Sequence, residues 1–121
     1  MRRIIQGIAA LALAAGAVTS IGATGAQAAG TYQGCPYGAV CVYPQDAGWN
    51  GGHPSNVYYS YGAHNLSNQV GTHIVFNNQS DGATAHLCTG YDGAGCGYQL
   101  NAYAYTGADL TPINSITLDR P

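Results

Sequence analysis

Basic side chains are almost absent from this chain. It contains no lysine, and its three arginines are Arg2, Arg3 and Arg120. From residue 29 onward one arginine stands against five aspartates, which gives a formal charge of −4. Binding to nucleic acid or to an anionic membrane surface requires several basic side chains that neutralise phosphates. The composition therefore argues against both kinds of partner.

Glutamate is also absent, so a pair of catalytic carboxylates would have to consist of two aspartates. The sequence has no Gly-x-Ser-x-Gly motif, which holds the nucleophile of α/β-hydrolases. The four histidines lack the spacing of zinc enzymes; they are His53, His64, His73 and His86. His64 and His73 flank one loop and could approach a metal together, although ordinary loop histidines are the simpler interpretation. The chain is predicted not to be an enzyme and to use no cofactor.

Only the start of the chain has a long apolar run. Arg2 and Arg3 form a positive segment, residues 4–18 are rich in Ala and Leu, and residues 26–28 (AQA) form a small-x-small cleavage site. The run is too short and too rich in Gly and Ala for a transmembrane anchor. Residues 1–28 are therefore predicted to be a signal peptide. The protein is expected to be secreted and extracellular, with no membrane span in its mature form.

Cysteine is scarce but even in number, at Cys35, Cys41, Cys88 and Cys96. In an exported chain this indicates disulfides. Of the three possible pairings we favour Cys35–Cys41 and Cys88–Cys96, because each pair is close in sequence. A zinc site is the competing interpretation, but neither pair has the spacing of a zinc knuckle. Each bridge is expected to stabilise the fold by about 2–3 kcal/mol in the chain-entropy model.

Helical periodicity is missing as well. No segment longer than about ten residues keeps a 3.6-residue apolar period, because Gly and Asn interrupt each candidate. The sequence predicts an all-β domain over residues 29–121 with seven or eight short strands. Strands are expected at residues 40–43, 59–61, 74–76, 98–105 and 113–118, with a long turn at residues 62–71 and the start of a second, similar half at residues 83–87.

Part of the pattern occurs twice, about 44 residues apart. The matched residues are Tyr59, Tyr61, Asn65, Leu66 and Ser67 with Tyr103, Tyr105, Asp109, Leu110 and Thr111, and Ile74 with Ile116. The repeat predicts two similar halves, at about residues 35–80 and 83–121. The polar, turn-forming residues 77–82 are the expected boundary between them.

Tyrosine is abundant, with ten residues, whereas tryptophan occurs once, at Trp49. The tyrosines fit half-buried positions on strands, and they also fit a binding face for protein or glycan. Trp49 likewise has two interpretations: an aromatic lid over the core or an exposed binding anchor. The lid is favoured because tryptophan is usually highly buried.

The order of these motifs resembles that of βγ-crystallin Greek keys: a glycine-rich turn, a Tyr-x-Tyr segment, the Asn65-Leu66-Ser67 turn and a closing strand. Together with Cys35-Pro36, the NLSNQ segment and the export signal, it is similar to the family of small secreted actinomycete proteins that includes the Streptomyces metalloproteinase inhibitor. The resemblance implies two Greek keys packed as a small disulfide-stapled β-sandwich.

The resemblance also implies a place to look for calcium. The corresponding segments are residues 68–73, with Asn68, Gln69 and Thr72 as potential ligands, and residues 110–115. Neither segment contains a carboxylate, and ligand charge sets calcium affinity. We therefore expect a degenerate structural turn and no metal.

The resemblance further implies an inhibitory loop whose reactive bond is Cys88–Thr89, within the loop closed by Cys96. A cross-linked loop is pre-organised, so it loses less entropy when it fills a protease cleft. Three of the seven enclosed residues are glycine, which predicts a more flexible loop. Thr89 is smaller and more polar than the residue that thermolysin-like enzymes prefer there, which leaves the target protease open.

Two functions follow as expectations. The first is a secreted inhibitor of an extracellular protease of the metalloproteinase type, acting as a monomer through Cys88 and Thr89. The alternative is a non-enzymatic structural or surface-interaction module of the βγ-crystallin type.

Overall fold

Eight short β-strands follow one another along residues 30–121, the part of the chain that the computed structural model describes. They are β1 (Val40–Val42), β2 (Asn56–Tyr58), β3 (Gly62–Asn65), β4 (Thr72–Asn77), β5 (Thr84–Cys88), β6 (Cys96–Leu100), β7 (Tyr105–Asp109) and β8 (Ser115–Asp119). The described residues contain one further element, the 3-10 turn η1 (Tyr91–Gly93). The all-β prediction is confirmed. The predicted signal peptide, residues 1–28, lies outside the described residues.

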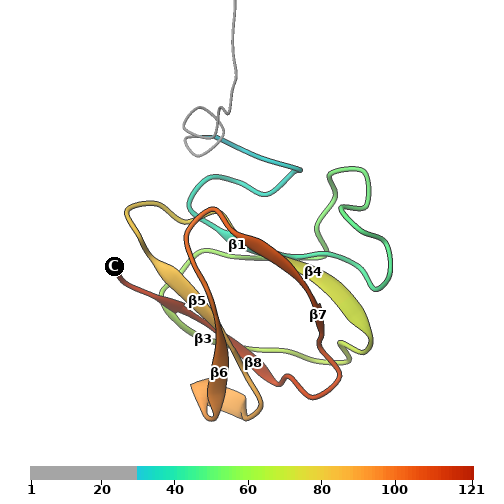
Figure 1. Cartoon of the computed structure of the whole chain (residues 1–121), viewed down its shortest axis with the longest axis vertical. Helices are drawn as coiled ribbons and strands as arrows, with labels where there is room; N and C mark the ends of the chain where they lie inside the picture. The colour runs from blue at the N-terminus through green and yellow to red at the C-terminus, as the bar shows by residue number, and fades with distance from the viewer. Residues whose placement is uncertain (1–29) are drawn as a thin grey trace, which may run out of the picture. The chain divides into compact units, whose positions relative to one another are not determined.

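The strands form two antiparallel sheets, which face each other in Figure 1. The first has the order β2-β1-β4-β7 and the second has the order β3-β8-β5-β6. Each sheet takes three strands from one half of the chain and one strand from the other half, because β7 joins the first sheet and β3 joins the second. The two orders are related: when each strand of the first sheet is replaced by the strand four places away in the chain, the result is the order of the second sheet read in reverse. Residues 31–121 form one compact unit, and no helix in the described region is long and apolar enough to cross a membrane.

One detail of the predicted repeat is wrong. Ile74 and Ile116 were paired by sequence, but Ile116 is fully buried between the sheets, whereas Ile74 packs against a separate cluster outside the first sheet. Successive side chains of a strand point to opposite faces, so a shift of one residue exchanges inside and outside.

The strand register identifies the true counterpart. Asn65 lies opposite Ser115, and its repeat partner Asp109 lies opposite Thr72. Thr72 therefore corresponds to Ser115. The next residue on each strand must correspond as well, so His73 is the counterpart of Ile116. His73 is 5 % exposed, so a histidine occupies the core position that an isoleucine fills in the other half.

The main core lies between the two sheets. Inward-facing side chains of both sheets and two leucines from turns build it: Val40, Val42, Leu66, Val75, Ala85, Leu87, Leu100, Leu110, Ile116 and Leu118. These positions alternate along the strands with outward residues, as expected for a sandwich.

A second cluster covers the outer face of the first sheet. Trp49 is half-buried there and makes edge-to-face contacts with four rings, those of Tyr32, Tyr43, Phe76 and Tyr105. The predicted aromatic lid is therefore confirmed. This cover makes β1 buried on both faces and explains its unbroken apolar sequence, Val-Cys-Val.

The strand predicted at residues 59–61 and the turn predicted at residues 62–71 are both wrong, for a local reason. Residues 59–61 connect β2 to β3, and the predicted turn at residues 62–71 contains β3. Gly62 has a φ of 108°, which only glycine adopts easily. The chain therefore bends immediately after Tyr61 and begins a new strand.

The predicted strand at residues 98–105 is likewise divided, into β6 and β7, which belong to different sheets. Tyr103 has a φ of 65°, and its N–H donates to the Asn77 carbonyl at 2.7 Å. This long-range bond stabilises a bend that the alternation of side chains does not reveal.

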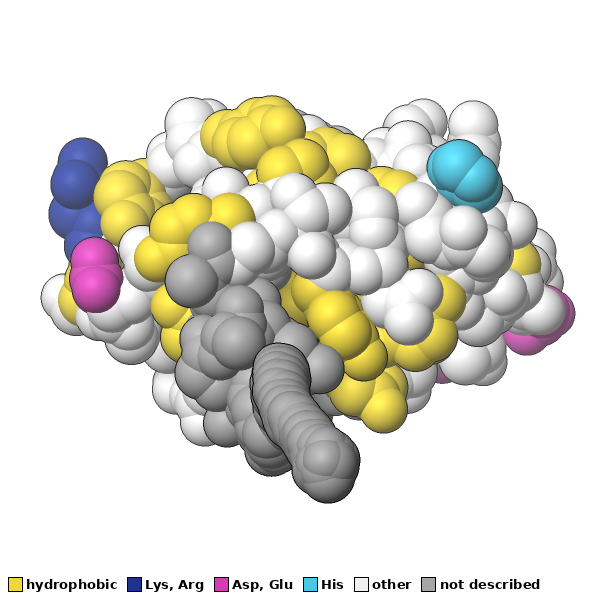
Figure 2. Space-filling model, turned by 90° about the horizontal axis from the view of Figure 1, so that it is seen from above, with side chains coloured by type: hydrophobic (Ala, Val, Ile, Leu, Met, Phe, Trp, Pro, Cys, Tyr) yellow, Lys and Arg dark blue, Asp and Glu magenta, His cyan; other side chains and the backbone are white. Residues whose placement is uncertain are grey.

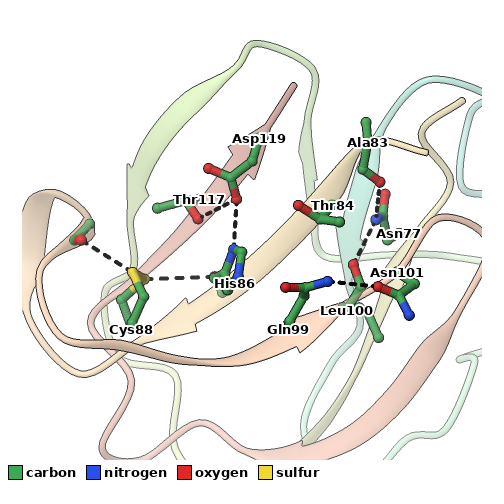
Figure 3. Close-up of polar contacts among 12 residues, drawn as sticks. Asn77, Ala83, Thr84, His86, Cys88, Gln99, Leu100, Asn101, Thr117 and Asp119 are labelled. Carbon is green, nitrogen blue, oxygen red and sulfur yellow. Dashed lines mark hydrogen bonds and ion pairs between the residues drawn. A yellow bond between two sulfur atoms is a disulfide. The ribbon is translucent and has the colours of Figure 1, made fainter. Parts of the chain in front are cut away.

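The boundary between the halves is polar as predicted, but its first three residues, 77–79, are buried. The side-chain amide of Asn77 donates to the carbonyls of Ala83 and Leu100, both at 3.0 Å (Figure 3). Its oxygen accepts the backbone N–H of Gln79 at 3.0 Å. Buried polar groups need such partners, so this side chain connects the end of the first half to the start of the second half and to the end of β6.

Candidate functional site

The candidate site is the loop that the second disulfide closes. The structure joins Cys35 to Cys41 and Cys88 to Cys96, which is the pairing favoured from the sequence. Among the described residues no cysteine is free. None is therefore available as a zinc ligand or as a nucleophile.

Cys88 ends β5 and Cys96 begins β6, and the two lie directly opposite each other in the strand register. Cys88 is fully buried, whereas Cys96 is exposed. The disulfide thus fastens the base of the loop to the core, and residues 89–95 project from the end of the second sheet.

Hydrogen bonds within the loop tighten it further. The Thr89 N–H donates to the Gly95 carbonyl at 3.1 Å, and the Gly90 N–H donates to the Ala94 carbonyl at 2.9 Å. Gly95 has a φ of 66°, and a β-carbon added there would lie 2.7 Å from the Thr89 hydroxyl oxygen. Any other residue at this position would have a strained backbone and would crowd the Thr89 hydroxyl, so glycine is required.

Asn114, which precedes β8, holds one side of the loop. Its backbone N–H donates to the Cys88 carbonyl at 2.9 Å, and its side-chain amide donates to the Thr89 carbonyl at 2.7 Å. Two successive carbonyls of the loop are therefore bound by a single residue.

Ser115 and Asn65 hold the other side. The Ser115 hydroxyl donates to the Gly90 carbonyl at 2.7 Å and accepts the Gly93 N–H at 3.0 Å. Asn65 makes a two-way contact with Asp92: its amide donates to the carboxylate at 3.0 Å, and its oxygen accepts the Asp92 N–H at 2.7 Å. The loop is therefore fixed by side chains from β3 and β8.

This geometry decides what the loop presents to solvent. The Cys88–Thr89 peptide bond is hydrogen-bonded on both sides, through the Cys88 carbonyl and the Thr89 N–H. The Asn114 N–H therefore already occupies one acceptor position of the Cys88 carbonyl oxygen. Tyr91 is 57 % exposed at the tip of the loop, beside the exposed carboxylate of Asp92.

A groove of about 400 Å³ begins at the base of the loop and runs between β6 and β7. Thr89 and Gly95 form its loop end, Gly97 and Tyr98 come from β6, and Asp109 is at the end of β7. Hydrogen bonds from the hydroxyl and the backbone N–H of Thr111 lower the pKa of the Asp109 carboxyl below its ordinary value. Asp109 therefore brings a negative charge to the groove at neutral pH.

The residues of the calcium-type turn have structural roles in the backbone of this segment. Gln69 donates to the Ser67 carbonyl at 3.2 Å, Asn68 has a φ of 58°, and Thr72 starts β4. Within residues 30–121, no group of three His, Cys, Asp or Glu side chains is placed to hold a metal ion.

His64 and His73 do not share a site. The His64 ring stacks on Tyr58 with centroids 4.7 Å apart, and its Nε2 lies 2.7 Å from the Ser60 carbonyl. His73 is buried between the carbonyls of Tyr43 and Val70, at 2.6 and 2.9 Å.

Sequence reasoning missed the side chains that support the loop. Asn65 was assigned to a turn, and Asn114 and Ser115 to a degenerate calcium segment. They contact loop residues 22 to 27 positions away in sequence, which no local pattern indicates. The only sequence signal for these supporting side chains was an Asn or Ser next to a predicted turn.

In comparisons with known proteins, the chain matches no family model, no curated protein and no solved structure. Its function is therefore inferred from its own residues and their geometry.

Proposed function

We propose that the protein is a secreted, non-enzymatic inhibitor of an extracellular protease, which it binds through the loop of residues 88–96. The observation that carries this proposal is the support of the loop: a disulfide at its base and side-chain hydrogen bonds from Asn65, Asn114 and Ser115. A loop held in one conformation loses little entropy on binding, so more of the contact energy is available as affinity.

The loop has two parts with different roles in this proposal. Tyr91 enters the partner's cleft, because large aromatic side chains are common anchors of protein interfaces. Thr89 lies on the flank, next to the reactive bond that the family resemblance implies. If that bond is cut, the disulfide and the Asn114 amide retain both ends, which favours slow dissociation.

We also propose that each half is a βγ-crystallin-like Greek key. Support comes from β4 returning to lie beside β1, from β8 lying beside β5, and from the exchange of β3 and β7 between the sheets. Secretion is supported by the two disulfides, which persist in oxidising compartments.

A panel of proteases tests the inhibitor proposal. The purified protein is mixed in several-fold molar excess with a thermolysin-like metalloprotease, a subtilisin-like serine protease and a papain-like cysteine protease. Residual activity should fall for one class, and Tyr91→Ala should weaken the effect. Tyr59→Ala is the matched control, because Tyr59 is 62 % exposed but lies outside the loop. If no enzyme in the panel loses activity, the proposal fails.

A surface-interaction module is the second candidate, and the exposed aromatic side chains favour it. Seven tyrosines have more than a third of their surface exposed: Tyr37, Tyr59, Tyr61, Tyr91, Tyr98, Tyr103 and Tyr105. Figure 2 shows one face on which hydrophobic patches lie among uncharged polar side chains and backbone, with charged side chains at its margins. Sedimentation with insoluble cell-envelope glycans tests this candidate. Retention by the glycan that Tyr59→Ala and Tyr61→Ala abolish supports it, and absence of retention excludes glycan binding.

A further inference from the structure

The two open sides of the sandwich are built differently. Between β2 and β3, the ring of Tyr58 stacks on His64. The 44-residue spacing of the repeat places Ala102 and Ala108 at the corresponding positions. Neither position carries a ring, and Ala108 lines the groove on this side, between β6 and β7.

The β7 edge of this groove has unpaired backbone groups. Ile74 lies opposite Gly107, and its carbonyl accepts the Tyr43 N–H at 2.9 Å on the far side of β4. Bonded and non-bonded pairs alternate along antiparallel strands, so Gly107 directs its N–H and C=O away from β4. The same alternation turns the backbone groups of Asp109 in that direction.

This edge lacks the usual protection against strand pairing. Natural edge strands are shielded by proline, lysine or a bulge. Residues 105–109 contain neither proline nor lysine, and their pairing with β4 is continuous. Gly107 and, on the facing strand, Gly97 are both exposed and have no side chain of their own.

The groove also has a charge preference. Asp109 is exposed at its end, and none of the described residues that line it is Lys, Arg or His. The one cation of residues 30–121, Arg120, lies over the ring of Tyr61 at 4.4 Å from its centroid. A cationic side chain placed at Asp109 would therefore meet an uncompensated carboxylate.

We propose that the groove between β6 and β7 binds an extended peptide segment of a partner protein, which pairs with β7 as an added strand and places a lysine or arginine side chain against Asp109. Strand addition supplies backbone hydrogen bonds through Gly107, and the charge contact supplies specificity. The volume of about 400 Å³ is near the lower end of ligand pockets, which suits a short segment. This proposal does not depend on protease inhibition by the loop.

The test titrates the isotope-labelled protein with short capped peptides and follows its amide NMR signals. One peptide alternates Thr and Val around a central Lys, the second carries Glu in place of Lys, and the third is the Lys peptide with alternate backbone nitrogens methylated. The Lys peptide should shift signals of β6 and β7 and bind roughly tenfold more tightly than the Glu peptide, since hydrogen bonds to charged groups are among the stronger ones. Methylation should abolish binding, because it removes the donors needed for strand pairing.

Two variants locate the contacts. Gly107→Pro removes the outward N–H and should abolish binding, and proline is tolerated where an edge N–H faces solvent. Asp109→Asn keeps an acceptor for the Thr111 N–H but removes the charge, so it should cancel the preference for Lys. Asp81→Asn is the matched control, because Asp81 is an exposed aspartate in a turn outside the groove.

Several results would overturn the proposal. They are equal weakening by Asp81→Asn and Asp109→Asn, signal changes confined to residues 89–95, and no signal change at millimolar peptide. Tyr91→Ala should leave peptide binding unchanged, which separates this groove from the inhibitory loop. Loss of peptide binding in a correctly folded Tyr91→Ala protein would assign the peptide to the loop and contradict the groove.

Discussion

The side-chain amide of Asn114 donates a 2.7 Å hydrogen bond to the carbonyl of Thr89, 25 residues earlier in the chain. The backbone N–H of the same residue binds the preceding carbonyl. One asparagine next to β8 thus fixes the backbone at the start of the candidate binding loop. The rigidity of this loop consequently depends on a strand that is distant in sequence.

Asn114→Ala should loosen the loop without unfolding the protein. Loss of one side-chain hydrogen bond is expected to lower the free energy of unfolding by about 1 kcal/mol. Amide hydrogen exchange should accelerate for residues 89–95 in particular. Asn101→Ala is the control, because its side chain bonds the exposed Gln99. Unchanged exchange in the loop would contradict the supporting role of Asn114.

Removal of the second disulfide, by replacing Cys88 and Cys96 with alanine, should lower the free energy of unfolding by about 2–3 kcal/mol. Removal of the first, at Cys35 and Cys41, should have a similar effect because the loop it closes is of similar length. Urea denaturation measures both. If the loop is the binding element, only the substitution of Cys88 and Cys96 should reduce protease inhibition when both proteins are folded.

His73→Ile transfers the residue of the equivalent core position into the first half. The change should lower the free energy of unfolding by about 1–2 kcal/mol, although isoleucine is more hydrophobic. The reason is the loss of the ring N–H, which donates to one of the carbonyls of Tyr43 and Val70. Thermal denaturation measures the effect, and Ile116→Val provides an apolar control at the matching site. A more stable His73→Ile protein would show that apolar packing outweighs these bonds.

Tyr43 should make stability depend on pH in the alkaline range. Its side chain is fully buried and its hydroxyl donates to the Gln33 carbonyl at 2.7 Å. Burial raises its pKa from 10.0 to about 12. The unfolded chain therefore loses this proton first as the pH rises, so stability is fully present below pH 10 and declines between about pH 10 and 12. Tyr43→Phe should show a shallower decline in denaturation curves collected across this range, and an unchanged slope would contradict the assignment.

Local patterns were sufficient for the fold class and for the covalent links. Glycine and asparagine interrupt every helical period, which leaves short strands as the regular element. Cys35 and Cys41, like Cys88 and Cys96, are close enough in sequence for proximity to favour their pairing. The aromatic cover provided by Trp49 was also accessible, because burial of tryptophan is a general tendency.

Local patterns failed where the deciding contact is distant. The bend at Tyr103 is held by Asn77, and it divides one alternating segment between two sheets. The register of β4 against β7 places His73 inside and Ile74 outside, and one residue of shift was enough to reverse this.

The sequence alone was enough to predict the β class, the leader, the shortage of cations and the two disulfides. Each of these depends on composition or on residues that are close in sequence. Only the tertiary structure decided which strands share a sheet, which side chains hold residues 89–95, and that a groove lies between β6 and β7 whereas two rings stack between β2 and β3. Those features arise from contacts between residues that are distant in sequence, whose geometry exists only after both sheets have packed.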